Sequence, residues 1–150
     1  MEKYLSDPLF LREIIMDHYQ NPRNKHLYED GEHFHEKHMV MDSCIDDITV
    51  QAKIKNGVID EVVWDGTACV ISTASTSIMT NLLKGKTVDE AMALIQTYNK
   101  MINLEDYDVN SMAEANAFNQ VGKQANRIGC ATIGWRAITD IIVESEEQNV

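Results

Sequence analysis

The sequence predicts an α+β fold in which helices pack on one face of a small antiparallel three-stranded sheet. Two observations support this prediction. Apolar and polar residues alternate in one early part of the chain, as in strands, and apolar residues recur at helical spacing, with helix caps, in a longer later part. A chain of 150 residues has the length of one domain with a sizeable core, so we expect residues 1–150 to form a single domain.

A short helix is expected before the strands. Asp7 and Pro8 match an N-cap followed by proline at the first helical position, and apolar residues then recur at helical spacing until Asn21-Pro22 ends the helix. Residues 23–37 contain charged residues and three histidines with little periodicity. This segment is therefore predicted to be a polar surface loop.

The sheet is expected to consist of one strand and a β-hairpin. The first strand is predicted at residues 39–41. Apolar and polar residues then alternate over residues 48–55, Asn56-Gly57 suits the positive φ angles of a tight turn, and residues 58–64 form the returning strand.

Two helices are predicted directly after the hairpin. Apolar residues at helical spacing over residues 71–83 are followed by Gly85, which is typical of the position just past a helix end. Thr87 and Glu90 have the spacing of a capping box, which indicates a second helix reaching residue 102.

The last third of the chain combines an acidic segment and a final helix. Residues 103–122 are interpreted as an acidic, loosely organised insertion that ends in a short helix at Gly122. The final helix is expected from Ala131 onward, and it leads into an acidic tail at residues 144–147.

The charge balance excludes two classes of partner. Thirteen Lys and Arg against 24 Asp and Glu give a net charge of −11, which repels nucleic acid and anionic membrane surfaces. The N-terminal residues 1–4 lack the pattern of a secretion signal, and three cysteines suit a reducing compartment, so a cytoplasmic protein is expected. Nothing in the sequence requires more than a monomer or a weak dimer.

The three cysteines are the main candidates for chemistry. Cys44, Cys69 and Cys130 fall at the ends of predicted elements, and a helix N-terminus at Cys69 and at Cys130 would favour the thiolate. Asp46 lies two residues after Cys44, and three thiolates with a carboxylate make a tetrahedral Zn²⁺ set. Arg127 could offset the negative charge of such a site. Because no CxxC pair is present, the alternative of isolated, buried structural cysteines stays open.

The histidines are weaker candidates. His33, His35 and His38 show no regular spacing, which favours solvated side chains in a polar segment. His18 is expected to be a packed or hydrogen-bonded residue of the first helix. Since every histidine lies at or before His38 and no nucleophile signature is present, a cysteine hydrolase is not favoured.

Five segments together resemble the IscU/NifU-like family, in order and along nearly the whole chain. They are residues 15–24 (IMDHYQNPRN), Cys44-Ile45-Asp46, Gly66-Thr67-Ala68-Cys69, Ser72-Thr73-Ala74-Ser75 and Arg127-Ile128-Gly129-Cys130-Ala131. Within the family the chain is similar to the SufU type. It has the extra acidic segment between Cys69 and Cys130, and it has no histidine directly before Cys130.

The resemblance implies a zinc-dependent sulfurtransferase of iron-sulfur cluster assembly. Such a protein takes persulfide sulfur from a PLP-dependent cysteine desulfurase of the SufS type and relays it. Carried over to this sequence, Cys44, Asp46, Cys69 and Cys130 are the implied zinc ligands and Cys44 is the implied sulfur acceptor. The partner is implied to donate a histidine to the zinc in place of Cys44, after which Arg127 could pair with Cys44 or Asp46.

Two departures and two alternatives accompany this interpretation. Ile45 stands where the family usually has glycine, and Ala68 replaces another common glycine, so a stiffer loop around Cys44 is expected. One alternative is a scaffold or carrier that holds a nascent iron-sulfur cluster on the same residues. The other is a small domain whose zinc is only structural.

Overall fold

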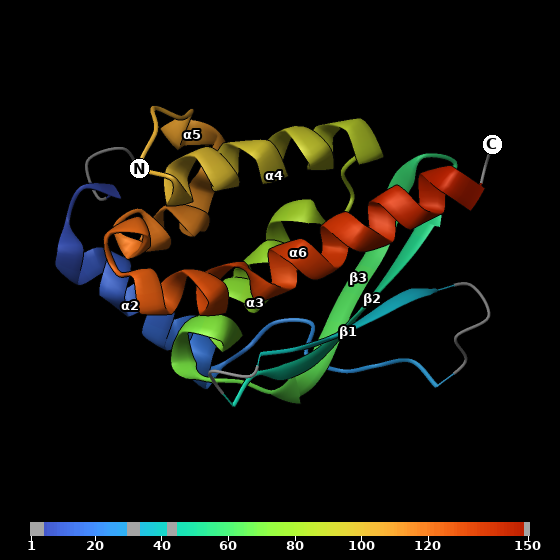
Figure 1. Ribbon diagram of the computed structural model, residues 1–150, viewed down its shortest axis with the longest axis horizontal. Coiled ribbons are helices and arrows are strands. Elements are labelled where there is room, and N and C mark those ends of the chain that lie inside the picture. Colours follow the sequence, from blue (N-terminus) through green and yellow to red (C-terminus); the bar gives the residue numbers. More distant parts are fainter. Residues whose placement is uncertain (1–4, 30–33, 42–44, 149–150) are drawn as a thin grey trace.

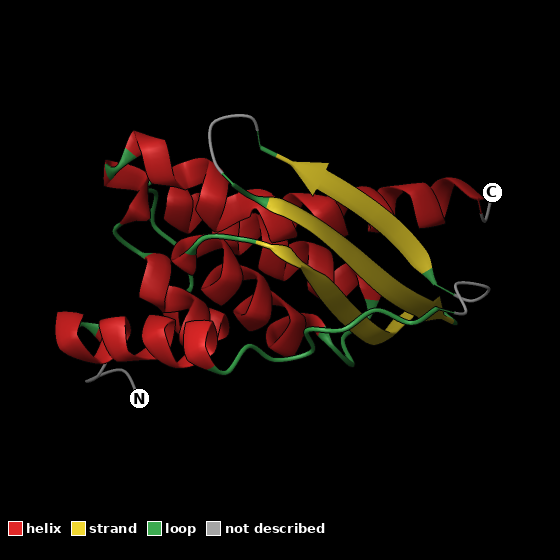
Figure 2. Ribbon diagram, turned by 90° about the horizontal axis from the view of Figure 1, so that it is seen from below, coloured by secondary structure: helices red, strands yellow, loops and turns green. Residues whose placement is uncertain are grey.

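Three antiparallel strands form one sheet in the order β1-β2-β3, and the helices pack on one of its faces (Figures 1 and 2). The computed structural model describes residues 5–29, 34–41 and 45–148. The strands are β1 (His35–Val40), β2 (Asp47–Lys55) and β3 (Val58–Thr67). This arrangement confirms the predicted α+β fold.

One long helix joins the sheet to the other helices. Helix α6 (Ala125–Gln148) packs against β1 and β2 and also against α3 (Val70–Leu83), while α2 (Pro8–Gln20) packs on α3 (Figure 1). The remaining elements are α4 (Val88–Ile102), α5 (Val109–Met112) and the 3₁₀ helices η2 (Ala113–Phe118) and η3 (Val121–Lys123). Among the described residues, no helix combines the length and apolar character needed to cross a membrane.

Local signals in the sequence fix several turns and helix ends as predicted. The Asp7 side chain accepts a hydrogen bond from the N–H of Leu9 at 3.0 Å and caps α2. Asn56 and Gly57 have φ angles of 55° and 75°, which are those of the expected tight turn. Thr87 opens α4 with the predicted capping box.

Strand β1 is longer than the sequence suggested, and it begins at His35 instead of residue 39. Of its six residues only Met39 and Val40 are apolar, so it lacks the alternation by which β2 was recognised. As an edge strand it pairs with β2 alone, and its side chains alternate between half-buried and exposed. The predicted polar loop over residues 23–37 is accordingly wrong at its end, where β1 has already begun.

Helix α6 begins at Ala125, six residues before the predicted start. Gly129 obscured this start, since glycine lowers helix propensity and residues 125–129 show no apolar periodicity. A Cβ at Gly129 would lie 2.3 Å from the Cε of Met41, so a larger residue here would require the Met41 side chain to move. Cys130 therefore lies inside the helix, and the prediction that it occupies the helix N-terminus is wrong.

The acidic segment 103–122 is an ordered part of the core, which corrects the expectation of a loosely organised insertion. Met112, Ala115, Asn116 and Phe118 are fully buried. Asn116 accepts a hydrogen bond from the Tyr107 hydroxyl at 2.6 Å and donates to the carbonyls of Val109 at 2.9 Å and Ala113 at 2.8 Å. The short 3₁₀ turns have no 3.6-residue period, which is why the sequence did not show this order.

Replacing Asn116 by alanine should destabilise the fold by about 1–3 kcal/mol, because the fully buried amide makes three hydrogen bonds, to Tyr107, Val109 and Ala113, that would all be lost. Urea denaturation would measure this loss. Gln120→Ala is the matched control, since Gln120 is exposed in the same segment. Equal stability of the two variants would contradict the role given to Asn116.

Candidate metal centre

Three potential metal ligands from distant parts of the chain meet at one point. An oxygen of Asp46 and the Sγ atoms of Cys69 and Cys130 all lie within 4.8 Å of one another. Asp46 directly precedes β2, Cys69 is the N-cap of α3, and Cys130 lies in α6. Asp46 and Cys130 are buried and Cys69 is partly exposed, so one side of the group faces the surface.

Asp46 is fully buried, and hydrogen bonds fix both of its carboxylate oxygens. Oδ1 accepts the backbone N–H of Cys69 at 2.9 Å, and Oδ2 accepts the hydroxyl of Ser72. The Asp46 carbonyl also accepts the N–H of Met41 at 2.9 Å. A buried carboxylate is costly without such partners, so the site is built to hold a charged oxygen ligand.

Cys69 is held by hydrogen bonds at the start of α3. As the N-cap of that helix, its Sγ accepts the backbone N–H of Ser72 at 3.4 Å and lies 3.1 Å from the Ser72 Oγ. It also lies 4.0 Å from Oδ2 of Asp46. The prediction that Cys69 lies at a helix N-terminus is therefore confirmed.

Ser72 is a site residue that the sequence reasoning did not single out. Its side chain is fully buried and contacts both Asp46 and Cys69. A serine three residues after a helix cap is a usable signal, because its N–H and hydroxyl both face the cap. The contact with Asp46 depends on the fold and has no such local signal.

A polar network in the core sets the position of α3 relative to α6. Ser75 of α3 donates to the carbonyl of Ala131 at 2.6 Å and accepts from the Trp135 indole at 3.1 Å. Tyr98 of α4 donates to the same carbonyl at 2.6 Å, and its ring stacks on Trp135 with centroids 3.8 Å apart. Because Ala131 follows Cys130, this network aligns the two cysteine-bearing helices.

Gly66 allows the end of β3 to approach β2 closely next to the site. Its φ angle is 140°, and a Cβ there would lie 2.1 Å from the carbonyl oxygen of Asp47 and 2.8 Å from the Cα of Ile48. Only glycine fits this position, which pairs across the sheet with Ile48, two residues after Asp46.

The donor set fits zinc. Two thiols and a carboxylate are ordinary zinc ligands, and in a tetrahedral site such ligand atoms stand about 3.5–3.8 Å apart. The separations of up to 4.8 Å need a contraction of only about 1 Å for bond lengths of this kind. The described residues supply three donors, which leaves one position of a tetrahedral site to another group.

Cys44 and Arg127 were predicted to act chemically, and of the two the structure describes only Arg127. Cys44 lies outside the described residues. Arg127 is in the first turns of α6 with an exposed side chain that lines a neighbouring pocket. Within the described part of the chain its guanidinium makes no ion pair, so its pairing with Asp46 or Cys44 stays a prediction.

The histidines in the described segments do not join the three ligands. His18 is fully buried, with Nδ1 2.7 Å from the Ser77 Oγ and Nε2 3.2 Å from a carboxylate oxygen of Glu114. His38 is exposed and pairs with Asp47 at 2.6 Å. The prediction of a packed, hydrogen-bonded His18 is confirmed. His33 lies outside the described residues.

The contact between His18 and Glu114 should make the free energy of unfolding depend on pH. The hydrogen bond from His18 holds the pKa of Glu114 below its usual value. A carboxylate with a lowered folded-state pKa stabilises the fold above its unfolded pKa, and this stabilisation disappears as pH falls through the folded value. We expect wild type to be more stable than Glu114→Gln at neutral pH and the difference to shrink as the pH falls below the unfolded glutamate pKa of about 4.3.

Urea denaturation across that pH range would measure the difference. Glu105→Gln is the control, because Glu105 is an exposed acidic residue of the same segment. A constant gap between wild type and Glu114→Gln at every pH would contradict the electrostatic origin.

Known proteins with similar sequences and structures are consistent with this site. A family model described as "NifU-like N terminal domain" matches residues 11–149. The zinc-dependent sulfurtransferase SufU of Bacillus subtilis is 32% identical over 143 residues, covering 92% of each chain. The iron-sulfur cluster assembly scaffold protein IscU of Streptococcus pyogenes is 30% identical over 133 residues, covering 88% of this chain and 82% of the relative.

A crystal structure shows the same likeness in three dimensions. A proposed iron-sulfur cluster assembly scaffold protein for the SUF system, from Fervidobacterium islandicum, superposes with a TM-score of 0.78. It is 25% identical, and the match covers 87% of this chain and 94% of that one.

Proposed function

This chain belongs to the NifU-like N-terminal domain family, and on that basis we propose that it is a zinc-dependent sulfurtransferase of iron-sulfur cluster assembly. In this function it accepts persulfide sulfur from a PLP-dependent cysteine desulfurase of the SufS type and relays it onward. The thiols involved must stay reduced, which suits the cytoplasm.

The observation that carries the proposal is the buried group of Asp46, Cys69 and Cys130. These three residues and Cys44 would hold the zinc. Cys44 lies two residues before Asp46, so the chain keeps their Cα atoms within about 7 Å of each other. The similarity to a relative named as a zinc-dependent sulfurtransferase supports the choice of metal.

The transfer step uses Cys44 as the nucleophile. Its thiolate attacks the outer sulfur of a persulfide on the desulfurase, a new S–S bond forms at Cys44, and the S–S bond of the donor breaks. The donor cysteine leaves as a thiolate, so no oxidant or reductant is consumed. Zinc, when bound, keeps its thiol ligands deprotonated. Arg127 would pair with Cys44 or Asp46 once Cys44 is released from the zinc.

Asp46 favours a second candidate function, a scaffold that holds a nascent iron-sulfur cluster. An oxygen ligand is exchanged more readily than a thiolate, which would help a cluster to leave. The similarity to proteins named as IscU scaffolds supports this candidate. The acidic segment 103–122 and the absence of a histidine before Cys130 favour the sulfurtransferase.

The test measures alanine formation from L-cysteine by a SufS-type desulfurase. The desulfurase is assayed alone, with zinc-loaded wild type and with Cys44→Ser protein, after the metal content of each has been determined. We expect wild type with about one zinc per chain to accelerate turnover and Cys44→Ser to have no effect. If neither accelerates turnover, and iron with sulfide builds a cluster on wild type under anaerobic conditions, the scaffold function replaces the proposal.

A further inference from the structure

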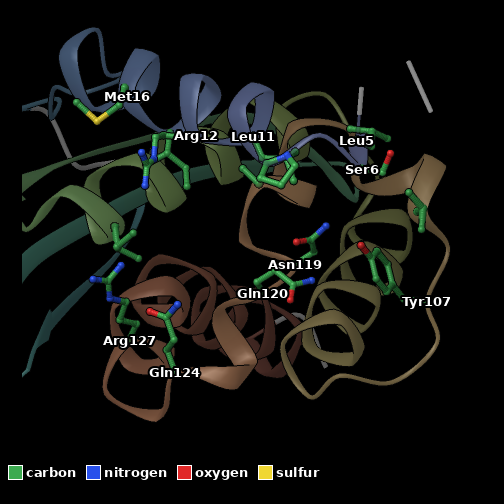
Figure 3. Close-up of a pocket in the computed structure, with 15 residues that line it drawn as sticks. Leu5, Ser6, Leu11, Arg12, Met16, Tyr107, Asn119, Gln120, Gln124 and Arg127 are labelled. Atoms are coloured by element: carbon green, nitrogen blue, oxygen red, sulfur yellow. The ribbon is translucent and has the colours of Figure 1, made fainter. Parts of the chain in front are cut away.

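A pocket of about 840 Å³ lies between α2, the acidic segment 103–122 and the first turns of α6 (Figure 3). Its apolar walls come from several elements and include Leu11, Ile15, Ile71 and Ala117. Met16 and Val109 also line the pocket, and they are 38% and 39% exposed. A hollow of this size, with apolar residues on its walls and at its rim, is typical of a binding site.

The pocket is positively charged although the protein is strongly acidic. Arg12 and Arg127 line it, and none of its 15 lining residues is acidic. Figure 3 shows the two arginine side chains reaching from α2 and α6 toward the same end of the pocket. Neither guanidinium forms an ion pair within the described part of the chain. In a chain of net charge −11, two arginines that line one pocket and make no ion pair with a described residue suit an anionic partner.

Two residues that line the pocket are close in sequence to the cysteines of the candidate metal centre. Ile71 lies two residues after Cys69 in α3, and Arg127 lies three residues before Cys130 in α6. Along the helix axis these offsets are rises of about 3 Å and 4.5 Å, so the pocket and the metal centre share neighbouring parts of α3 and α6. A protein segment seated in the pocket would therefore lie near the metal centre.

We propose that this pocket anchors an acidic segment of the sulfur-donating protein, in which a carboxylate stands beside an apolar side chain. The carboxylate binds the guanidinium groups of Arg12 and Arg127, and the apolar side chain packs against the walls on α2 and α3. The amide side chains of Asn119, Gln120 and Gln124 line the pocket too and can bind the backbone of the segment. The inference rests on the proposed function, because it names a contact of the same partner.

The experiment reverses the charge at Arg12, which is exposed on α2 and has no part in the transfer step. Equilibrium binding of zinc-loaded protein to the SufS-type desulfurase is measured for wild type, Arg12→Glu and Arg12→Gln. We expect the Kd to rise at least about tenfold for Arg12→Glu and less for Arg12→Gln, and to depend less on salt in both. Arg136→Glu is the matched control, because Arg136 is exposed on α6 outside this pocket.

The turnover assay separates this inference from the proposed function. Arg12→Glu should raise the protein concentration needed for half-maximal acceleration and leave the maximal acceleration unchanged. Equal Kd values for wild type, Arg12→Glu and Arg136→Glu would overturn the pocket inference while acceleration by wild type upholds the function. Weakened binding by Arg12→Glu without acceleration by wild type would uphold the pocket and overturn the function. No binding by wild type would overturn both.

Discussion

Replacing Gly66 by alanine should lower the unfolding temperature by about 6–12 °C, which corresponds to about 3 kcal/mol in a chain of this length. The added Cβ would meet the carbonyl oxygen of Asp47 and the Cα of Ile48, and neither backbone atom can move without displacing the start of β2. Because Asp46 directly precedes that strand, we also expect weaker zinc binding. Calorimetry and metal analysis of the purified variant would measure both effects.

The variant Gly57→Ala is the control that distinguishes the steric contact at Gly66 from the cost of a positive φ angle. Gly57 also has a positive φ angle, of 75°, but a Cβ there would meet nothing within 4 Å. Alanine at this turn should cost only the strain of the left-handed conformation, about 1–2 kcal/mol, and should leave zinc binding unchanged. Equal losses in the two variants would show that the contact with β2 has no effect of its own.

Replacing Asp46 by alanine should weaken zinc binding by at least about 100-fold. The change removes the proposed oxygen ligand, and it also leaves the N–H of Cys69 and the hydroxyl of Ser72 without their acceptor in a buried site. A competition titration against a chromophoric chelator would give the affinity. In thermal unfolding, a chelator should lower the midpoint of wild type and barely change that of the variant, since bound metal stabilises only the folded state.

Asp47→Ala is the control for Asp46→Ala. Asp47 is the next residue in the chain, but its side chain is exposed and pairs with His38 at the surface. This variant should bind zinc as wild type does. If Asp46→Ala retains the affinity of wild type, Asp46 is not a ligand and the role given to its carboxylate is wrong.

Features that depend on a few neighbouring residues could be predicted from the sequence. The cap at Asp7, the turn at Asn56-Gly57 and the capping box at Thr87 each need only local contacts. The start of α6 was misplaced because Gly129 weakens the local helix signal. The side chain that lies against this glycine, that of Met41, comes from a distant segment. Strand β1 was predicted too short because its partner in the sheet, and not its own residues, determines its extent.

The sequence was enough to predict which residue types form the candidate site, but not how those residues are arranged in space. Asp46, Cys69 and Cys130 stood out because thiols and a carboxylate are zinc ligands, although 23 and 61 residues separate them. The role of Ser72 could not be predicted, since it depends on how closely α3 approaches Asp46. The pocket beside the site was missed for the same reason, because α2, α6 and the acidic segment form it together.

Ser72 has one hydroxyl proton and two neighbours that can accept it. In the structure this proton goes to Asp46, and the Cys69 sulfur receives the backbone N–H of Ser72 instead. Since the hydroxyl oxygen already lies 3.1 Å from that sulfur, a turn of the O–H about the Cβ–Oγ bond of Ser72 is enough to redirect the proton. The site can thus follow a change of charge between its oxygen and its sulfur without moving its backbone, and replacing Ser72 by alanine would make that redistribution impossible.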